Sequence, residues 1–120
     1  MDLGEFDGMK VQDWAEQYPD LRNAWNENPA TFKMPGGESL KEVQTRAKET
    51  LEGITSNYSD DTTILLSSHN FVNLSILCDI LKIPHNRFRE LRQENAAFNI
   101  INKKEDQYYV ELLNEKSHLQ

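Results

Sequence analysis

Residues 62–68, TTILLSS, constrain the fold more than any other part of this sequence. Their apolar residues do not alternate with polar ones, a pattern typical of a strand that helices bury on both faces of an α/β sheet. The apolar run that follows is long enough for a helix packed against such a strand, and Pro84 closes it. We therefore predict an α/β fold: a small mixed sheet with strand 62–68 at its centre, covered by a helix at 71–82.

A second helix is predicted at 39–56. Ser39, with Glu42 three residues later, forms a capping box ahead of apolar residues at helical spacing. This helix should cover the same sheet. The remaining patterns predict shorter elements: a helix within 9–18 that ends before Pro19, a loop at 26–39, one helical turn at 87–91, and an antiparallel hairpin made by AAFNII at 96–101 and YYVELL at 108–113.

Length and charge limit the functional classes. The 120 residues suit one domain, 1–120, and 13 Lys plus Arg against 20 Asp plus Glu leave a net charge of −7. This balance argues against nucleic acid as a partner, because binding a phosphate backbone needs clustered cations. The sequence has neither a leader-like start nor an apolar run long enough for a membrane span, and its lone cysteine, Cys78, excludes a disulfide framework. We expect a cytoplasmic protein.

His69 is the first candidate for chemistry, since it stands at the C-terminal end of the predicted strand. Catalytic groups of open α/β sheets gather there. Ser67, Ser68 and the first amides of the next helix would suit a phosphate. The alternative is a buried histidine that holds a loop through hydrogen bonds, and the residues alone leave both interpretations open.

The stretch PGGES at 35–39 is the second candidate. Paired glycines let a loop approach a ligand closely, and Glu38 could supply an acid or a hydrogen-bond acceptor. The alternative is a flexible turn before an ordinary helix, in which Ser39 only caps.

No metal or other cofactor is expected. His85 and His118 stand at no paired ligand spacing, and the sequence contains no glycine-rich nucleotide fingerprint. Four arginines fit a solvated or ion-paired surface better than a phosphate site: Arg46, Arg87, Arg89 and Arg92.

Five motifs, taken in order, resemble the histidine phosphatase superfamily, in particular the branch of phosphoglycerate mutase-like and α-ribazole phosphatases. They are GEFDG at 4–8, YPDLRNAW at 18–25, PGGES at 35–39 with Arg46 seven residues later, LLSSHN at 65–70 and ENAAFNII at 94–101. The resemblance runs along the whole chain but covers only the C-terminal part of the family's domain. It implies an incomplete phosphoglycerate mutase-like fold.

By this resemblance, His69 corresponds to the second active-site histidine, which binds and polarises the phosphoryl group. The backbone amide of Asn70 would lie beside a phosphate oxygen, and Glu38 and Ser39 remain further candidates for substrate binding. Asn70 replaces the glycine more usual in the family, and Asn73 stands near the place of a frequent arginine.

The family's nucleophilic histidine, in an Arg-His-Gly motif, has no counterpart here, nor do a second arginine and the acid. The resemblance therefore implies the C-terminal portion of a phosphatase or mutase that acts on small phosphomonoesters through a phosphohistidine, with this chain alone inactive. The alternative is a non-catalytic anion-binding or assembly module derived from that fold.

Assembly is a further expectation. In the family, the missing first strand lies beside the strand that ends at His69, so residues 64–66 should border an unpaired edge. Unpaired strand edges favour association. We expect a homodimer or a larger homo-oligomer. One way to build it is the exchange of segments between copies of the chain.

Overall fold

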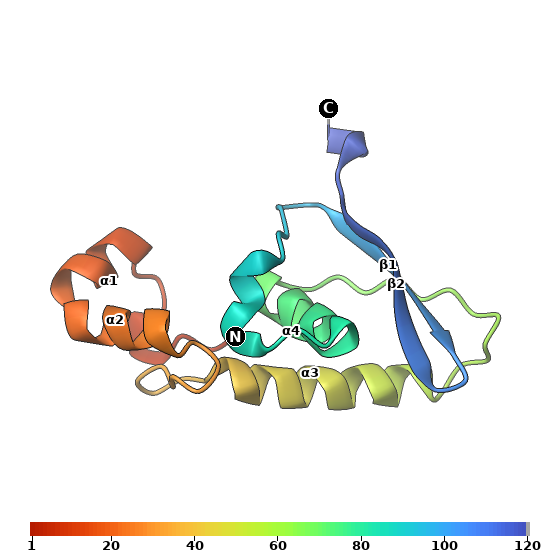
Figure 1. The fold of residues 1–120 in the computed structure, drawn as a ribbon, viewed down its shortest axis with the longest axis horizontal. Coiled ribbons are helices and arrows are strands. Elements are labelled where there is room, and N and C mark those ends of the chain that lie inside the picture. Colours follow the sequence, from red (N-terminus) through yellow and green to blue (C-terminus); the bar gives the residue numbers. More distant parts are fainter. Residues whose placement is uncertain (120) are drawn as a thin grey trace.

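In the computed structural model, helix α3 forms the base of the molecule, with two short helices at one end and a β-hairpin at the other (Figure 1). The structure describes residues 1–119. The α/β class is confirmed. The elements are, in order, the 3₁₀ helix η1 (Gly4–Phe6), α1 (Val11–Gln17), α2 (Pro19–Glu27), α3 (Leu40–Thr55), α4 (Asn70–Leu81), the 3₁₀ helix η2 (His85–Glu90), β1 (Phe98–Lys104), β2 (Gln107–Glu115) and the 3₁₀ helix η3 (Ser117–Leu119).

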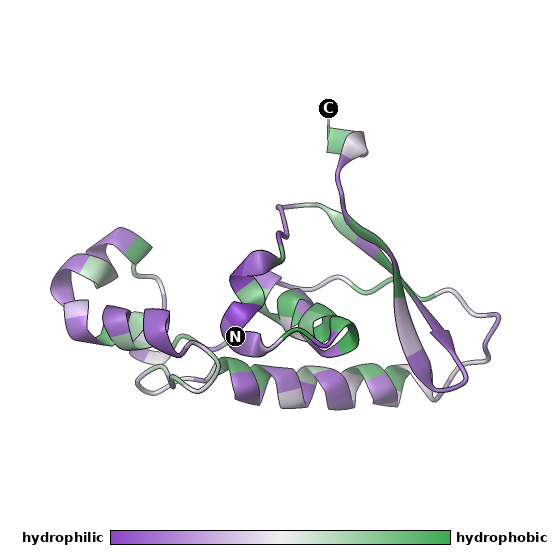
Figure 2. Ribbon diagram, viewed as in Figure 1, coloured by the Kyte–Doolittle hydropathy of each residue, from purple (hydrophilic) through white to green (hydrophobic). Residues whose placement is uncertain are grey.

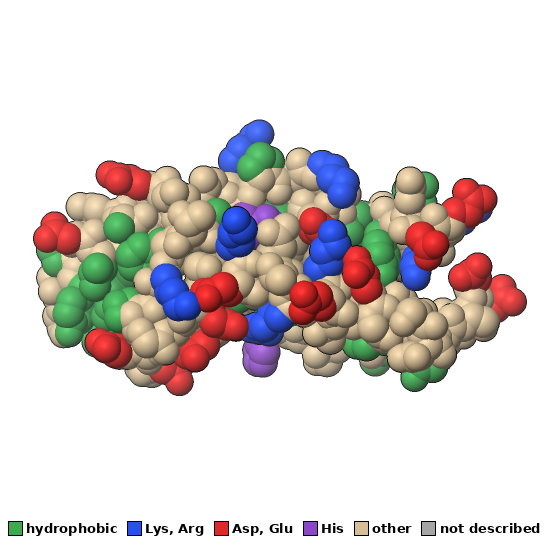
Figure 3. Space-filling view, turned by 90° about the horizontal axis from the view of Figure 1, so that it is seen from below, with side chains coloured by type: hydrophobic (Ala, Val, Ile, Leu, Met, Phe, Trp, Pro, Cys, Tyr) green, Lys and Arg blue, Asp and Glu red, His purple; other side chains and the backbone are tan. Residues whose placement is uncertain are grey.

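Helix α3 confirms the prediction for 39–56. Its capping box is present: the amide of Glu42 donates to Oγ of Ser39 at 3.2 Å, and the amide of Ser39 donates to Oε2 of Glu42 at 2.8 Å. Leu40, Val43 and Ala47 are the buried residues, and polar residues alternate with apolar ones along the helix (Figure 2). The side seen in Figure 3 carries charges of both signs, in keeping with a solvated helix face.

Helix α4 confirms the prediction for 71–82. It is apolar on most sides (Figure 2), and four of its residues are buried: Leu74, Ser75, Leu77 and Cys78. Lys82 ends the helix in the left-handed conformation with φ +58°, while the amide of Ile83 donates to the carbonyl of Cys78 at 2.9 Å. Such an ending satisfies free carbonyls, and Pro84 follows it.

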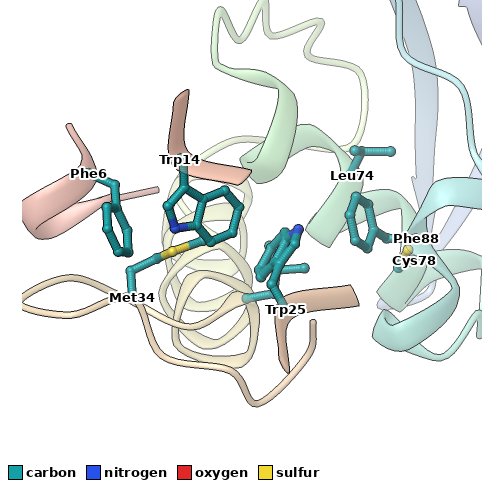
Figure 4. Close-up of a cluster of buried hydrophobic side chains, with 8 residues drawn as sticks. Phe6, Trp14, Trp25, Met34, Leu74, Cys78 and Phe88 are labelled. Carbon is teal, nitrogen blue, oxygen red and sulfur yellow. The ribbon is translucent and has the colours of Figure 1, made fainter. Parts of the chain in front are cut away.

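One aromatic cluster joins the N-terminal helices to α4 (Figure 4). The predicted helix within 9–18 is α1, and Pro19 also begins α2, because proline is favoured at the first helical position. The rings of Trp25 and Phe71 meet edge to face, with centroids 6.0 Å apart. The buried members of the cluster are Phe6, Trp14, Trp25, Met34, Leu40, Leu74, Cys78 and Phe88.

The C-terminal hairpin is confirmed, but the described sheet contains only its two antiparallel strands, β1 and β2, and is not mixed. Glu105 and Asp106 turn the chain with φ +50° and +60°. Two such residues fit the tight turn whose twist matches that of the flanking strands.

The prediction of a central strand at 62–68 is wrong. These residues are extended but belong to neither strand, and Leu65 is 95% exposed. Their pattern fits a strand between two neighbours, yet no backbone within residues 1–119 pairs with 63–68. A strand exists only through hydrogen bonds to a neighbour, so the segment remains irregular. Helices α3 and α4 consequently pack against each other rather than on a sheet formed by this segment.

Candidate functional site

His69 lies where the extended segment 62–69 enters helix α4. It is the N-cap residue, with extended backbone at φ −109° and ψ 160°, and its carbonyl accepts the amide of Asn73 at 3.0 Å. Its imidazole makes no capping hydrogen bond and is exposed. The backbone of His69 therefore starts the helix, while the side chain is left available to a ligand.

The first turn of α4 adds backbone donors beside this imidazole. The amides of Asn70, Phe71 and Val72 donate to no backbone carbonyl among the described residues, and the turn contains no acidic residue. Free amides and the helix dipole make the start of a helix favourable for an anion. His69 and Asn70, both predicted as site residues, are thus brought together.

An open cavity of about 700 Å³ adjoins His69 and the start of α4. Its walls are the C-terminal end of α3, the segment 58–70, one side of α4, and residues 93–103, which include most of β1. Within this lining, His69 is the one histidine and Lys103 the one Lys or Arg, while Asp60 and Glu94 are the acids. The cavity can admit a small anion but surrounds it with little positive charge.

Lys103 lines the cavity but is not among the site residues predicted from the sequence. Its ammonium lies 3.5 Å from Oγ1 of Thr55, which in turn lies 2.9 Å from the hydroxyl of Tyr108. Strand alternation could have identified it, because Lys103 shares the half-buried face of β1 with Asn99 and Ile101.

Glu38 lies outside this cavity. Nε of Arg46 donates to its Oε1 at 2.7 Å, and the amide of Asp2 donates to its Oε2 at 2.8 Å. The hydrogen bond from Arg46, reinforced by that of Asp2 and opposed by partial burial, lowers the pKa of Glu38 to about 2. The carboxylate is therefore a charged link between the chain's first residues and α3.

Ser39 also lies outside the cavity, and the capping box occupies its side chain. Ser39 as a whole is only 6% exposed. Of the four predicted site residues, the structure brings His69 and Asn70 together and places Glu38 and Ser39 in a separate structural cluster.

The glycines of PGGES let this loop pack closely against residues 2–5 at the N-terminus. A Cβ at Gly37 would lie 2.5 Å from the carbonyl oxygen of Asp2, and one at Gly4 would lie 2.1 Å from that of Pro35. The amide of Glu5 donates to Pro35 at 2.9 Å. Two motifs distant in the sequence, GEFDG and PGGES, are therefore one packing unit.

The other histidines stand apart from His69. Burial lowers the pKa of His85, whose Nε2 has no hydrogen-bond partner within residues 1–119. Nε2 of His118 lies 3.0 Å from the carbonyl of Ala96, and its ring packs at a tilt of 45° against that of Phe98. Within residues 1–119, no three His, Cys, Asp or Glu side chains gather as a metal site, and no helix is long and apolar enough to cross a membrane.

The candidate arginines mostly have partners. Arg87 forms a two-point pair with Glu90 at 2.6 and 2.8 Å. Arg89 lies over the rings of Phe88 and Trp25. These contacts favour structural roles for both.

A second cavity, of about 320 Å³, lies between α3, α4 and the hairpin turn. Two of its charged side chains pair with each other, since Nζ of Lys48 lies 3.8 Å from Oδ2 of Asp79, and Oδ1 of Asp79 also accepts from Gln44 at 3.3 Å. His69 does not line it. We therefore place the candidate site in the larger cavity.

The comparisons with known proteins show the family to which the chain belongs. The model of the histidine phosphatase superfamily (branch 1) matches residues 1–116. Phosphoserine phosphatase 1 of Hydrogenobacter thermophilus is 29% identical over 119 residues, which are 99% of this chain and 56% of the relative. The chain thus spans little more than half the length of that relative.

This chain likewise covers little more than half of the solved structures that it matches. YhfR of Bacillus stearothermophilus aligns with a TM-score of 0.90 and 19% identity, over 99% of this chain and 59% of its own. The α-ribazole phosphatase of Shigella flexneri aligns with a TM-score of 0.79 and 17% identity, over 96% and 56%. At these identities the likeness concerns the fold.

Proposed function

The chain belongs to branch 1 of the histidine phosphatase superfamily, and we propose that it is the C-terminal portion of a phosphoglycerate mutase-like phosphatase that hydrolyses small phosphomonoesters. The observation that carries the proposal is the position of His69. Its free imidazole stands at the start of α4, beside unpaired amides and on the wall of an open cavity.

The proposed reaction needs a second histidine from outside this chain. A nitrogen of that histidine attacks phosphorus, the bond from phosphorus to the alcohol oxygen breaks, and the alcohol takes a proton from an acid. Water then attacks phosphorus, the bond from phosphorus to the histidine nitrogen breaks, and the proton lost by water returns to the acid as phosphate leaves. His69 would donate a hydrogen bond to a phosphoryl oxygen while the amides of α4 stabilise its negative charge.

Two observations support small phosphomonoesters as the substrate class: the volume of the cavity beside His69, about 700 Å³, and the names of the relatives. Phosphoserine, named in one relative, is the first compound to assay in a complete parent enzyme. We further propose a cytoplasmic location, since the free and buried thiol of Cys78 suits a reducing compartment.

Phosphate binding by the isolated chain tests the role of His69. Titration with inorganic phosphate should shift the imidazole signals of His69 and the amide signals of Asn70 to Val72 in nuclear magnetic resonance spectra, with saturation in the millimolar range. His69→Ala should abolish the amide shifts, and His118→Ala should preserve them. Equal shifts in the wild type and in His69→Ala would refute the assignment.

A second candidate is a non-catalytic anion-binding or assembly module. The observation in its favour is the single histidine and single cation of the cavity lining. The DNA upstream of the first codon decides between the two functions. A continuous reading frame that encodes an Arg-His-Gly motif supports the phosphatase, whereas an in-phase stop codon with a ribosome-binding site before Met1 supports the module.

A further inference from the structure

The turn at 94–97, within the motif ENAAFNII, contains a strained residue. It lies in the connection between η2 and β1 (Figure 1), where the amide of Ala97 donates to the carbonyl of Glu94 at 3.2 Å. Between them, Ala96 has φ +60°, in the left-handed region. Turns with this conformation at their third residue favour glycine or asparagine there, because a Cβ makes it costly. Other contacts must therefore hold the turn in this shape.

Side chains at the end of β2 and just beyond it supply such contacts. Oδ1 of Asn114 accepts the amide of Glu94 at 2.8 Å, and Lys116 pairs with the Glu94 carboxylate. Asn114 is fixed in turn, since Oδ1 of Asn99 accepts its amide at 2.8 Å. Strained backbone persists where surrounding contacts over-determine it, and it is concentrated at functional sites. The strain at Ala96 therefore indicates a role for this turn beyond connecting two elements.

The turn forms part of the cavity wall that also contains His69 and Asn70. Asn95, its second residue, is exposed on that wall. Two neighbouring carboxamides occupy each other: Nε2 of Gln93 donates to Oδ1 of Asn99 at 3.1 Å, and Nδ2 of Asn99 donates to Oε1 of Gln93 at 2.7 Å. Asn95 stands outside this pair, so its carboxamide is open to a ligand in the cavity.

We propose that Asn95 is a substrate-specificity residue. Its carboxamide binds a hydroxyl group on the alcohol portion of a phosphomonoester, while His69 and the first amides of α4 bind the phosphoryl group. A carboxamide donates and accepts hydrogen bonds, as a hydroxyl group does, and it has no charge with which to select a carboxylate or an ammonium group. The acid of the turn, Glu94, is already paired with Lys116. The inference rests on the proposed function, and it adds hydroxyl-bearing alcohols, such as sugars and polyols, as the preferred substrate class.

Ligand titration of the chain, followed by nuclear magnetic resonance, tests this role. The probes are inorganic phosphate, O-phosphoserine and D-ribose 5-phosphate. The wild type should bind ribose 5-phosphate about fivefold more tightly than phosphate, as one added hydrogen bond allows, and only this probe should shift the side-chain amide signals of Asn95. Asn95→Ala should abolish the preference and leave the dissociation constants of phosphate and phosphoserine unchanged.

Asn102→Ala is the matched control. Asn102 contributes another carboxamide to the same cavity wall, but its Nδ2 donates to the Glu111 carboxylate. Its removal should therefore preserve the preference for ribose 5-phosphate.

Ala96→Gly separates a positioning role of Ala96 from a merely structural one. Glycine adopts φ +60° without strain, so this variant should unfold at a temperature about 4 °C higher. It should also loosen the turn and lower the preference for ribose 5-phosphate by about twofold or more, because Asn95 is then less firmly oriented. A more stable variant with an unchanged preference would contradict the positioning role of Ala96.

Failure of this inference differs from failure of the proposed function. Phosphate binding that is absent, or that His69→Ala leaves unchanged, would overturn both. Binding of phosphate that depends on His69, combined with equal affinities for phosphate and ribose 5-phosphate, would overturn the role of Asn95 alone. The same conclusion would follow if Asn95→Ala weakened the binding of all three probes equally.

Discussion

Arg46 and Glu38 form a two-point ion pair that joins helix α3 to the loop before it, with Nε to Oε1 at 2.7 Å and Nη2 to Oε2 at 3.0 Å. Glu38 also accepts the amide of Asp2, so one carboxylate connects three segments. The spacing of PGGES and Arg46, which contributed to the family resemblance, thus has a structural explanation.

Removal of the Glu38 charge should destabilise the chain in a pH-dependent manner. The pKa of Glu38 is about 2 in the folded state, below its ordinary value of 4.5, so its ion pair adds stability above pH 4.5 and loses it as the pH falls toward 2. Glu38→Gln should cost about 1–2 kcal/mol at pH 7, less than the full shift implies because Arg46 is half-exposed. The difference should vanish near pH 2. Urea denaturation at several pH values measures it.

Glu90→Gln is the matched control. Glu90 forms a similar two-point pair with Arg87, but both side chains are more than half exposed and lie on one 3₁₀ helix. Solvent screens such pairs, so this variant should lose less stability than Glu38→Gln at pH 7. Equal losses would mean that Glu38 does not link separate segments of the fold.

Loss of the Ser39 hydroxyl should weaken the start of α3. Ser39→Ala removes the acceptor for the amide of Glu42 and should cost about 1 kcal/mol of unfolding free energy. Ser56→Ala, at the exposed end of the same helix, should change stability by less than about 0.5 kcal/mol. In a complete parent enzyme, Ser39→Ala should leave KM unchanged, and a large rise in KM would show that Ser39 binds substrate.

We predict that the isolated chain releases no phosphate from p-nitrophenyl phosphate or phosphoserine above background, because the family resemblance implies that the nucleophile, both arginines and the acid have no counterpart in it. Steady turnover that His69→Ala abolishes would contradict this expectation. If the proposed parent enzyme is assembled, His69→Ala should lower its kcat by about three orders of magnitude or more, since residues of one site act as a unit. His118→Ala provides the control.

The Cys78 thiol should be unreactive in the folded protein. Its side chain is fully buried, and burial raises its pKa to about 11. At pH 8, a thiol-specific reagent should label Cys78 at least 100-fold more slowly than a cysteine placed at exposed Ser56, because the thiolate is the reactive form. Both rates should become equal in guanidinium chloride. Rapid labelling of the native chain would indicate that α4 opens locally.

The larger part of the fold was predictable because its causes are local. The Ser39 capping box marked the start of α3, Pro84 marked the end of the α4 region, and the turn between β1 and β2 closed a hairpin from neighbouring residues. For the site, position after the predicted strand indicated His69, and the family resemblance added Asn70 beside it. Strand alternation could place Lys103 on one face of β1, but its position at the cavity depends on the packing of the hairpin.

The sequence by itself determined the helices, the hairpin and the place of His69 just before a helix, while the exposure of its side chain is known only from the structure. Helices and tight hairpins form hydrogen bonds between residues close in the chain, so a short window contains most of the information. Tertiary structure alone decided that residues 62–68 are not a strand and that Glu38 pairs with Arg46 rather than lining the cavity. Both outcomes depend on which distant segments lie alongside, and a β-branched, apolar run becomes a strand only where another backbone supplies its hydrogen bonds.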